Sequence, residues 1–567
     1  MSEPVTAFDQ TLHGWRAYAL VALIALVSAT FGAARSPVLD PEEARFAQTS
    51  RQMAETGDGA RARFQGETTA TAALGVHWLQ ADAARATLPM TQKLNAIWPY
   101  RLPSALGLVV AALATLWGGA ALIGRRAALL GASLFAAGML AGFEGMSANA
   151  GAVLLGFTTL ALAAAARLRA PSAPRPLVHA LIFWAALAGA LLANGLLGPL
   201  IIALTLSALA LWERDAQWAA RLLMRGAPLI APAIIVACFA FAGVSWTDAL
   251  RSLASWPAGS SQTSAPLPGF HLFLLPFLIF PATYALPAAA RLIWETTRAP
   301  RKDDAHAGMR LLICWAAPAL LAVELLAVRW PDDALLAYPA LALMCGAGLA
   351  AMRGRPWRTA HPAGLVLFGF AGAVVVTITA ATATFMPGDF TTDIRRAASA
   401  ALIGLGIVGA ALAALLMLRQ PTARAAVLVA CALVLSFSLR ERLLPEAREL
   451  HVSSEITAAL TRARLMPREG RSLWVVGYRG PSLVFLTRTD IQIVDTESAA
   501  TQAARGDALV VEGTRLEEMR ARLAQRGLAF VPSEPAIRGL SLAHGERVVL
   551  FVGPVSDAAA AGQLQNP

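Results

Sequence analysis

Apolar segments of about the length that a helix needs to cross a bilayer recur along most of this chain. A membrane-spanning helix needs roughly 20 apolar residues to cross about 30 Å of hydrocarbon. Only 15% of the residues are charged, whereas soluble domains carry about 25%. We therefore expect a mainly α, polytopic transmembrane helical bundle of about thirteen spans, near 15–34, 103–123, 127–145, 148–166, 177–193, 197–212, 229–246, 270–291, 311–328, 335–352, 363–385, 397–418 and 425–439.

Positive charges alternate between the two sides of these segments. If the N-terminus is cytoplasmic, the short outer connections hold only four, Arg251, Arg329, Arg395 and Arg396. The short cytoplasmic connections then hold Arg125, Arg126, Arg167, Arg169, Arg175, Arg214, Arg221, Arg225, Arg291, Arg298, Arg301, Lys302, Arg310, Arg353, Arg355, Arg358, Arg419 and Arg424. Cytoplasmic loops are enriched in Lys and Arg, so the pattern predicts a cytoplasmic N-terminus. Lysine occurs only at Lys93 and Lys302, which we interpret as the mark of a GC-rich bacterial genome. We therefore expect a protein of the bacterial inner membrane.

The composition changes near residue 440. We expect a transmembrane domain over 1–440, including a long outer loop at 35–101 with interfacial helices, and a soluble periplasmic α/β domain over 441–567. Apolar runs predict strands within Ser472–Leu486, as LWVVGY and SLVFL, and also at Ala508–Val511 and Arg547–Val552. An amphipathic pattern predicts a helix over Leu516–Gly527.

Charge and cysteine placement exclude two classes of function. The net charge is +11, but the basic residues lie between apolar segments rather than on one face, so no nucleic-acid partner is predicted. The four cysteines lie inside apolar segments without metal-ligand spacing, so neither a disulfide framework nor a cysteine metal site is expected: Cys238, Cys314, Cys345 and Cys431.

The outer loop begins with a charged helix signal. Asp40 stands at an N-cap position before Pro41, and the pattern predicts a helix from Asp40 to Asp58 on the membrane surface. Glu42, Glu43 and Arg45 then fall in its first turn. Acids at a helix N-terminus are favourable in any protein, so ordinary capping explains the cluster as well as a site does.

The same cluster suits an enzyme that works on a lipid phosphate. A carboxylate takes the proton from an acceptor hydroxyl, and a guanidinium holds phosphate oxygens through paired hydrogen bonds. We treat this loop as the place where chemistry is expected.

Nine stretches distributed over the chain carry a family resemblance. In chain order they are EEARFAQTSRQMAETGD (42–58), FQGE (64–67), GVHWLQA (75–81), IWPYRLPS (97–104), GLLGPL (195–200), PLPGFHLFLLP (266–276), AYPALALM (337–344), GYRGPSLVFL (477–486) and RGLSLAHGERVVL (538–550). They resemble the GT-C glycosyltransferases that take a sugar from a polyprenyl-phosphate carrier, namely the aminoarabinose transferases of lipid A and the protein O-mannosyltransferase-like family. The resemblance implies their fold, a polyprenyl-phosphate-linked sugar donor and a lipid or glycan acceptor.

The chain departs from the family pattern where the family's chemistry lies. Glu42 replaces the family's aspartate, and Ala72 and Ala73 replace a Lys-Pro pair. The His and Glu expected before 266–269 are replaced by small polar residues. No lysine lies between Lys93 and Lys302 to take over phosphate binding.

The resemblance and these departures leave three hypotheses. In the first, the protein is a transferase with Glu42 and Glu43 as catalytic residues and Arg45, Arg101 and Arg329 as phosphate-binding residues. A divalent metal is neither predicted nor excluded. In the second, the activity is reduced or lost, and the protein is a non-catalytic partner of another membrane protein or a lipid-binding subunit. In the third, it transports a lipid-linked sugar, which ranks last because internal repeats are absent from the sequence.

Overall fold

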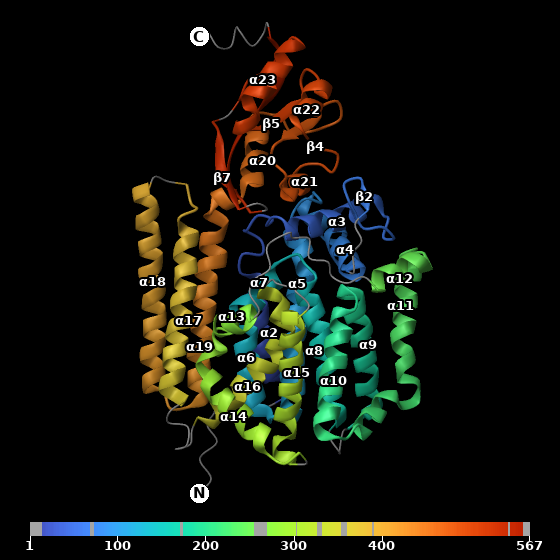
Figure 1. Ribbon diagram of the computed structural model, residues 1–567, viewed down its shortest axis with the longest axis vertical. Helices are drawn as coiled ribbons and strands as arrows, with labels where there is room; N and C mark the ends of the chain where they lie inside the picture. Colours follow the sequence, from blue (N-terminus) through green and yellow to red (C-terminus); the bar gives the residue numbers. More distant parts are fainter. Residues whose placement is uncertain are drawn as a thin grey trace.

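The structure is a computed structural model. It describes residues 14–68, 73–169, 174–254, 269–301, 303–325, 331–352, 360–387, 390–533, 535–542 and 545–558. A long helical bundle carries a small mixed sheet domain at one end, and the helices α3 and α4 lie between the two (Figure 1).

Within the described chain, nine helical stretches are long and apolar enough to span a bilayer. They are Trp98–Leu122 (α5), Gly151–Arg169 (α8), Pro176–Asn194 (α9), Gln217–Phe241 (η1 and α11), Asp304–Glu324 (η3 and α15), Ala334–Ala351 (η4 and α16), Ala360–Ala383 (α17), Thr391–Met417 (within α18) and Pro421–Glu446 (α19, η6 and η7). The prediction of a polytopic membrane protein is confirmed.

Two bent pairs bring the number of candidate spans to as many as eleven. Helix α6 (Arg125–Ala136) meets α7 (Met139–Met146) at 57°, and α13 (Phe270–Leu278) meets the Ala282–Arg298 stretch of η2 and α14 at 104°. The remaining two of the thirteen expected segments form shorter apolar helices, α2 (Trp15–Thr30) of 16 residues and α10 (Leu197–Glu213) of 17 residues.

Small residues let the helices of the bundle approach closely. A Cβ atom at Gly107 of α5 would lie 2.5 Å from the carbonyl oxygen of Ala152 in α8. A Cβ at Gly156 would in turn lie 2.7 Å from the carbonyl oxygen of Gly107. Helix association in a membrane relies on such close packing, because lipid tails are as apolar as the side chains.

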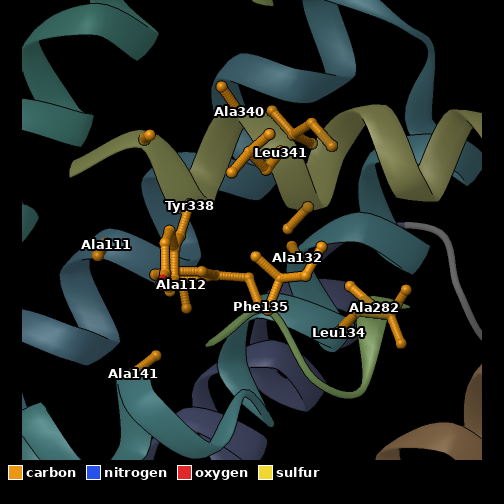
Figure 2. Close-up of a cluster of buried hydrophobic side chains, with 14 of the residues drawn as sticks. Ala111, Ala112, Ala132, Leu134, Phe135, Ala141, Ala282, Tyr338, Ala340 and Leu341 are labelled. Carbon is orange, nitrogen blue, oxygen red and sulfur yellow. The ribbon is translucent and has the colours of Figure 1, made fainter. Parts of the chain in front are cut away.

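The interior of the bundle is filled by alanine and leucine with a few rings. Figure 2 shows Leu134 and Phe135 of α6 facing Leu341 and Tyr338 of α16 (Tyr338–Ala351), with Ala112 of α5 beside them. All five belong to one buried cluster that runs through the bundle.

The sheet domain has its strands in the order β4-β3-β5-β8-β6, with β7 also paired to β8. Strands β3 (Leu473–Val476), β4 (Gln492–Val494) and β5 (Ala508–Glu512) are parallel. The long β8 (Glu546–Asp557) is antiparallel to its neighbours. The other elements are α20 (Val452–Arg462), α21 (Pro481–Leu486), α22 (Thr496–Gln502), α23 (Leu516–Gln525), β6 (Leu528–Phe530) and β7 (Ile537–Ser541).

One sequence-based prediction for this domain is wrong. The run SLVFL was expected to form a strand, but it forms the helix α21, with Pro481 in its first turn. A short apolar run has no periodicity that separates a buried strand from a buried helix. A proline at the first helical position is the local signal that favours the helix.

Residues 35–101, which were expected to form the first outer loop, contribute α3 (Glu42–Thr56), a short hairpin of β1 (Arg63–Phe64) and β2 (Glu67–Thr68), and α4 (Leu74–Thr91). The helix expected over Asp40–Asp58 is therefore present. The expected capping role of Asp40 is wrong, because Pro41 occupies the N-cap and no side chain caps the helix.

Candidate functional site in the first outer loop

The first turn of α3 divides its charged residues between two environments. Glu42 and Arg45 are exposed, whereas Glu43 is only 5% exposed. Residues three apart share a helix face, so Glu42 and Arg45 lie together on the solvent side while Glu43 points into the protein.

Glu43 forms a buried ion pair with Arg101 of α5. The Arg101 Nε donates to Glu43 Oε1 and Nη2 donates to Oε2, both at 2.8 Å. The Arg101 residue is 1% exposed. This bidentate ion pair is the strongest hydrogen-bonded arrangement between a guanidinium and a carboxylate.

Backbone groups complete the coordination of both side chains. The amides of Leu39 and Ala148 each donate to Glu43 at 2.8 Å. The Arg101 Nη1 donates to the carbonyl oxygens of Ala33 and Ser36 at 2.9 and 2.8 Å, and Nη2 donates to that of Pro37 at 3.0 Å. The pair thus fastens the segment before α3 to the top of α5.

The structure therefore places the candidate catalytic and phosphate-binding residues in different environments. It brings Glu43 and Arg101 together, with their polar atoms bonded to each other and to the backbone. It leaves Glu42 and Arg45 exposed, and the Arg45 guanidinium carbon lies 5.4 Å from the ring centre of Phe64. Arg329 lies outside the described residues.

A second buried polar cluster joins the loop to the sheet domain. The Ser482 amide donates to Asp40 Oδ1 at 2.7 Å, and the Ser482 hydroxyl donates to Oδ2. The Ser482 Oγ lies 2.6 Å from Ser453 Oγ, which in turn lies 2.9 Å from the Tyr478 hydroxyl oxygen. Three hydroxyl groups thus form a chain that ends on one carboxylate.

The enclosure of Asp40 changes its acidity. Burial raises the pKa of Asp40 to about 6, although the hydrogen bonds from Ser482 act in the opposite direction and the charge of Glu43 adds to the rise. A carboxylate in water has a pKa of about 3.9. The contact between loop and domain consequently contains a group that titrates near neutral pH.

Helix α3 also caps the C-terminal end of α21. The Arg51 Nη1 donates to the Phe485 carbonyl oxygen at 2.5 Å, and its Nε donates to Glu55 Oε1 at 2.7 Å. Carbonyl groups at a helix end lack partners inside the helix, and a cation there also meets the negative end of the helix dipole. Further along, the Gln65 Nε2 donates to the Ile491 carbonyl oxygen at 2.9 Å.

Sequence reasoning missed the contacts of Asp40 with Ser482, Ser453 and Tyr478. The pattern around Asp40 indicated a helix cap, and Ser482 was noted only as part of a Gly-Pro-Ser-Leu stretch. The two residues are 442 positions apart in the chain, so no local signal links them.

Metal binding was left open by the sequence. Among the residues that the structure describes, no group of three or more His, Cys, Asp or Glu side chains is arranged to hold a metal ion. His77 of α4, for example, is buried with its Nδ1 2.8 Å from the Ser50 hydroxyl oxygen, and it stacks on Phe46. Burial lowers the pKa of His77 to about 3, so it is neutral.

Comparison with known proteins identifies the fold. No protein-family model matches the sequence, and no curated protein matches it. The solved structure of ArnT from Cupriavidus metallidurans in the apo state matches with a TM-score of 0.70 and 17% identity, over 94% of this chain and 97% of that chain. The ArnT structure bound to undecaprenyl phosphate matches equally well, with 18% identity over the same shares.

This likeness shows the fold of the chain. It is an integral membrane protein with the helical GT-C fold that ArnT has, followed by a small mixed-sheet domain. The fold class predicted from the sequence is confirmed.

Proposed function

We propose that the protein is a membrane glycosyltransferase that moves a sugar from a polyprenyl-phosphate carrier to a lipid or glycan acceptor. The observation that carries this proposal is the match over nearly the whole of both chains to ArnT, which has been solved with undecaprenyl phosphate bound. Fold alone hosts many functions, so the proposal also needs groups that can do the chemistry.

Glu42 and Arg45 are those groups. Both are exposed on one face of the first turn of α3. In the proposed reaction, the Glu42 carboxylate takes the proton from the acceptor hydroxyl as that oxygen attacks the sugar. Arg45, together with Arg329, balances the negative charge on the departing polyprenyl phosphate.

Glu43 and Arg101 have a supporting role in this proposal. Their atoms are bonded to each other and to backbone groups of the loop. A buried charge that already has its partners would lose them on binding phosphate, at a cost of several kcal/mol. The pair instead fixes the start of α3 over the bundle, and so fixes the position of Glu42 next to it.

The proposed orientation follows from the arginine distribution. The N-terminus would lie in the cytoplasm of a bacterium, and the first outer loop and the sheet domain would lie in the periplasm. Both elements lie at the same end of the bundle (Figure 1), so the donor and acceptor would meet on the periplasmic face of the inner membrane.

A non-catalytic role is the second candidate, and one observation favours it. Ala72 and Ala73 stand where the family has a Lys-Pro pair, and the Arg101 guanidinium is already paired with the Glu43 carboxylate. A protein with this fold and a weakened anion site would retain a polyprenyl-phosphate lipid without transferring its sugar, as a subunit that presents the lipid to a partner.

The test uses the full-length protein purified into lipid nanodiscs. Polyprenyl-phosphate sugars are supplied as donors together with lipid and glycan acceptors, and release of the lipid phosphate is measured. We expect turnover that Glu42→Gln lowers by at least about a hundredfold, as for loss of a general base. Asp82→Asn is the matched control, because Asp82 is 73% exposed on α4 and its ion pair with Arg85 spans 3.8 Å.

The two candidates give different results. Binding of undecaprenyl phosphate without release of sugar from any donor would refute the transferase and support the lipid-binding subunit. Equal turnover by wild type and Glu42→Gln would refute the assignment of Glu42 while leaving the activity in place.

A further inference from the structure

A polar cleft lies where the last membrane helix becomes the sheet domain. It has a volume of about 400 Å³ and is bounded by Pro37 of the first loop, by Pro445 and by residues of α20 from Ser454 to Arg462. The candidate span Pro421–Glu446 ends inside this cleft. The cleft therefore lies at the depth where the hydrocarbon ends and lipid headgroups begin.

Charges of both signs line the cleft. Arg448 and Arg462 contribute guanidinium groups, and Glu446 and Glu455 contribute carboxylates. The Arg448 Nε lies 3.8 Å from Glu455 Oε1, and Glu446 Oε1 lies 3.7 Å from Arg35 Nη2. These distances exceed a hydrogen bond, so Arg448, Glu446 and Glu455 keep their capacity to bond a ligand.

His451 also lines the cleft and carries a hydrogen-bond acceptor. It is 5% exposed, and its Nε2 lies 2.8 Å from the Leu444 carbonyl oxygen. A carbonyl only accepts, so Nε2 carries the proton and the neutral ring has a lone pair on Nδ1. Nδ1 is buried and has no hydrogen-bond partner within the described residues. Burial lowers the pKa of His451, which keeps the ring neutral.

These groups define the chemistry of a ligand. Guanidinium groups bind phosphate oxygens by paired hydrogen bonds. Two carboxylates and an imidazole lone pair accept hydrogen bonds, and a primary ammonium offers three donors. A ligand that satisfies both halves of the cleft carries a phosphate and a primary ammonium a few bonds apart.

We propose that this cleft binds the headgroup of a zwitterionic phospholipid of the surrounding bilayer, a phosphate diester that carries a primary ammonium. Its phosphate lies against Arg448 and Arg462, and its ammonium lies against Glu455, Glu446 and the Nδ1 of His451. The acyl chains extend along the outer end of the last span. This inference requires only that the protein spans a membrane and is independent of the transferase proposal.

The bound lipid would touch the buried centre of the loop. Pro37 lines the cleft, and its carbonyl oxygen accepts a hydrogen bond from Arg101 at 3.0 Å. A headgroup in the cleft thus packs against the segment that the Glu43–Arg101 pair holds, and it would stabilise the same segment from the opposite side.

The experiment titrates the detergent-purified full-length protein with single lipids and measures bound lipid by native mass spectrometry. The probes are dioleoyl phosphatidylethanolamine, its choline analogue, which lacks ammonium protons, and its glycerol analogue, which lacks the cation. We expect the ethanolamine lipid to bind at least about tenfold more tightly than either analogue, the effect of one or more charge-assisted hydrogen bonds.

Two substitutions of cleft residues test whether the lipid binds in the cleft. Glu455→Gln is expected to reduce the preference for ethanolamine over choline, and Arg448→Gln to weaken binding of the ethanolamine and choline lipids together. Arg479→Gln is the matched control, because Arg479 is exposed on the sheet domain and does not line the cleft. Equal affinity for the three lipids would overturn the proposal, and so would an unchanged ethanolamine preference in Glu455→Gln or an unchanged affinity for both lipids in Arg448→Gln.

Discussion

Asp40 makes the contact between the first outer loop and the sheet domain dependent on pH. In the docked state its pKa is about 6, and in water a carboxyl has a pKa of about 3.9. A folded-state pKa that is raised means that the docked state binds the proton more tightly than the open state. The stabilisation from protonation is therefore fully present at low pH and is lost as the pH rises through 6.

The two pKa values set the size of the effect. Between pH 7 and pH 5 the docked carboxyl takes up its proton almost completely, whereas the hydrated carboxyl stays largely ionised. The free energy of opening the contact is then higher at pH 5 than at pH 7 by about 1.3 kcal/mol. That difference corresponds to about ninefold in the opening equilibrium.

Hydrogen exchange of the Ser482 amide measures this opening. The amide lies in the first turn of α21, where it has no partner in the helix, and it donates to Asp40 at 2.7 Å. Protection of this amide, corrected for the intrinsic effect of pH on exchange, should be about ninefold greater at pH 5 than at pH 7. Asp40→Asn should abolish the difference, since an amide side chain does not titrate.

The Ser498 amide provides an internal control. It donates to Asp495 Oδ1 at 2.7 Å in the same domain, but hydrogen bonds from Ser498 lower the pKa of Asp495. Its corrected protection should be constant between pH 5 and pH 7. The reasoning about burial would be refuted if Ser482 behaved like Ser498, or if Asp40→Asn kept the pH dependence.

Three further predictions concern stability. Arg101→Met should lower the free energy of unfolding by about 3–5 kcal/mol, because it leaves a buried carboxylate unpaired. The loss should appear as a lower thermal midpoint in detergent, and adding Glu43→Gln should recover part of it. A midpoint equal to wild type in Arg101→Met would contradict a buried pair. Arg51→Gln should weaken docking of the sheet domain by about 1.5–3 kcal/mol, so a protease should release the domain faster. An unchanged rate of cleavage would show that the bonds from Arg51 to the end of α21 do not stabilise the docked domain. Gly142→Ala would place a methyl group 2.7 Å from an Arg440 nitrogen and should cost about 1–3 kcal/mol, whereas Gly406→Ala, which meets open space inside α18, should not lower the midpoint.

Features with a local cause could be predicted from the sequence. Apolar segments must form helices in a bilayer, because every backbone group needs a partner there. The helix over Glu42–Thr56 and the strands at β3, β5 and β8 also follow from nearby residues. The SLVFL run was too short for its periodicity to decide between helix and strand.

Features that join distant parts of the chain could not be predicted. The sequence placed Glu43 and Arg101 in one candidate site, but nothing local indicates that each neutralises the other across 58 residues. Asp40 was expected to cap a helix, yet it bonds Ser482 instead. Tertiary contacts decide which of two acceptable partners a charged side chain takes, and the sequence pattern specifies only that a partner is needed.

The distance in sequence between Asp40 and Ser482 has a consequence for biosynthesis. The chain is inserted from its N-terminus, so the first outer loop reaches its side of the membrane while its partners are still to be translated. Helix α3 gains its contacts with α21 only when the last hundred or so residues have been made and folded. A chain that stops early would span the membrane with an unfinished loop, so the sheet domain makes completion of translation a condition for assembling this end of the molecule.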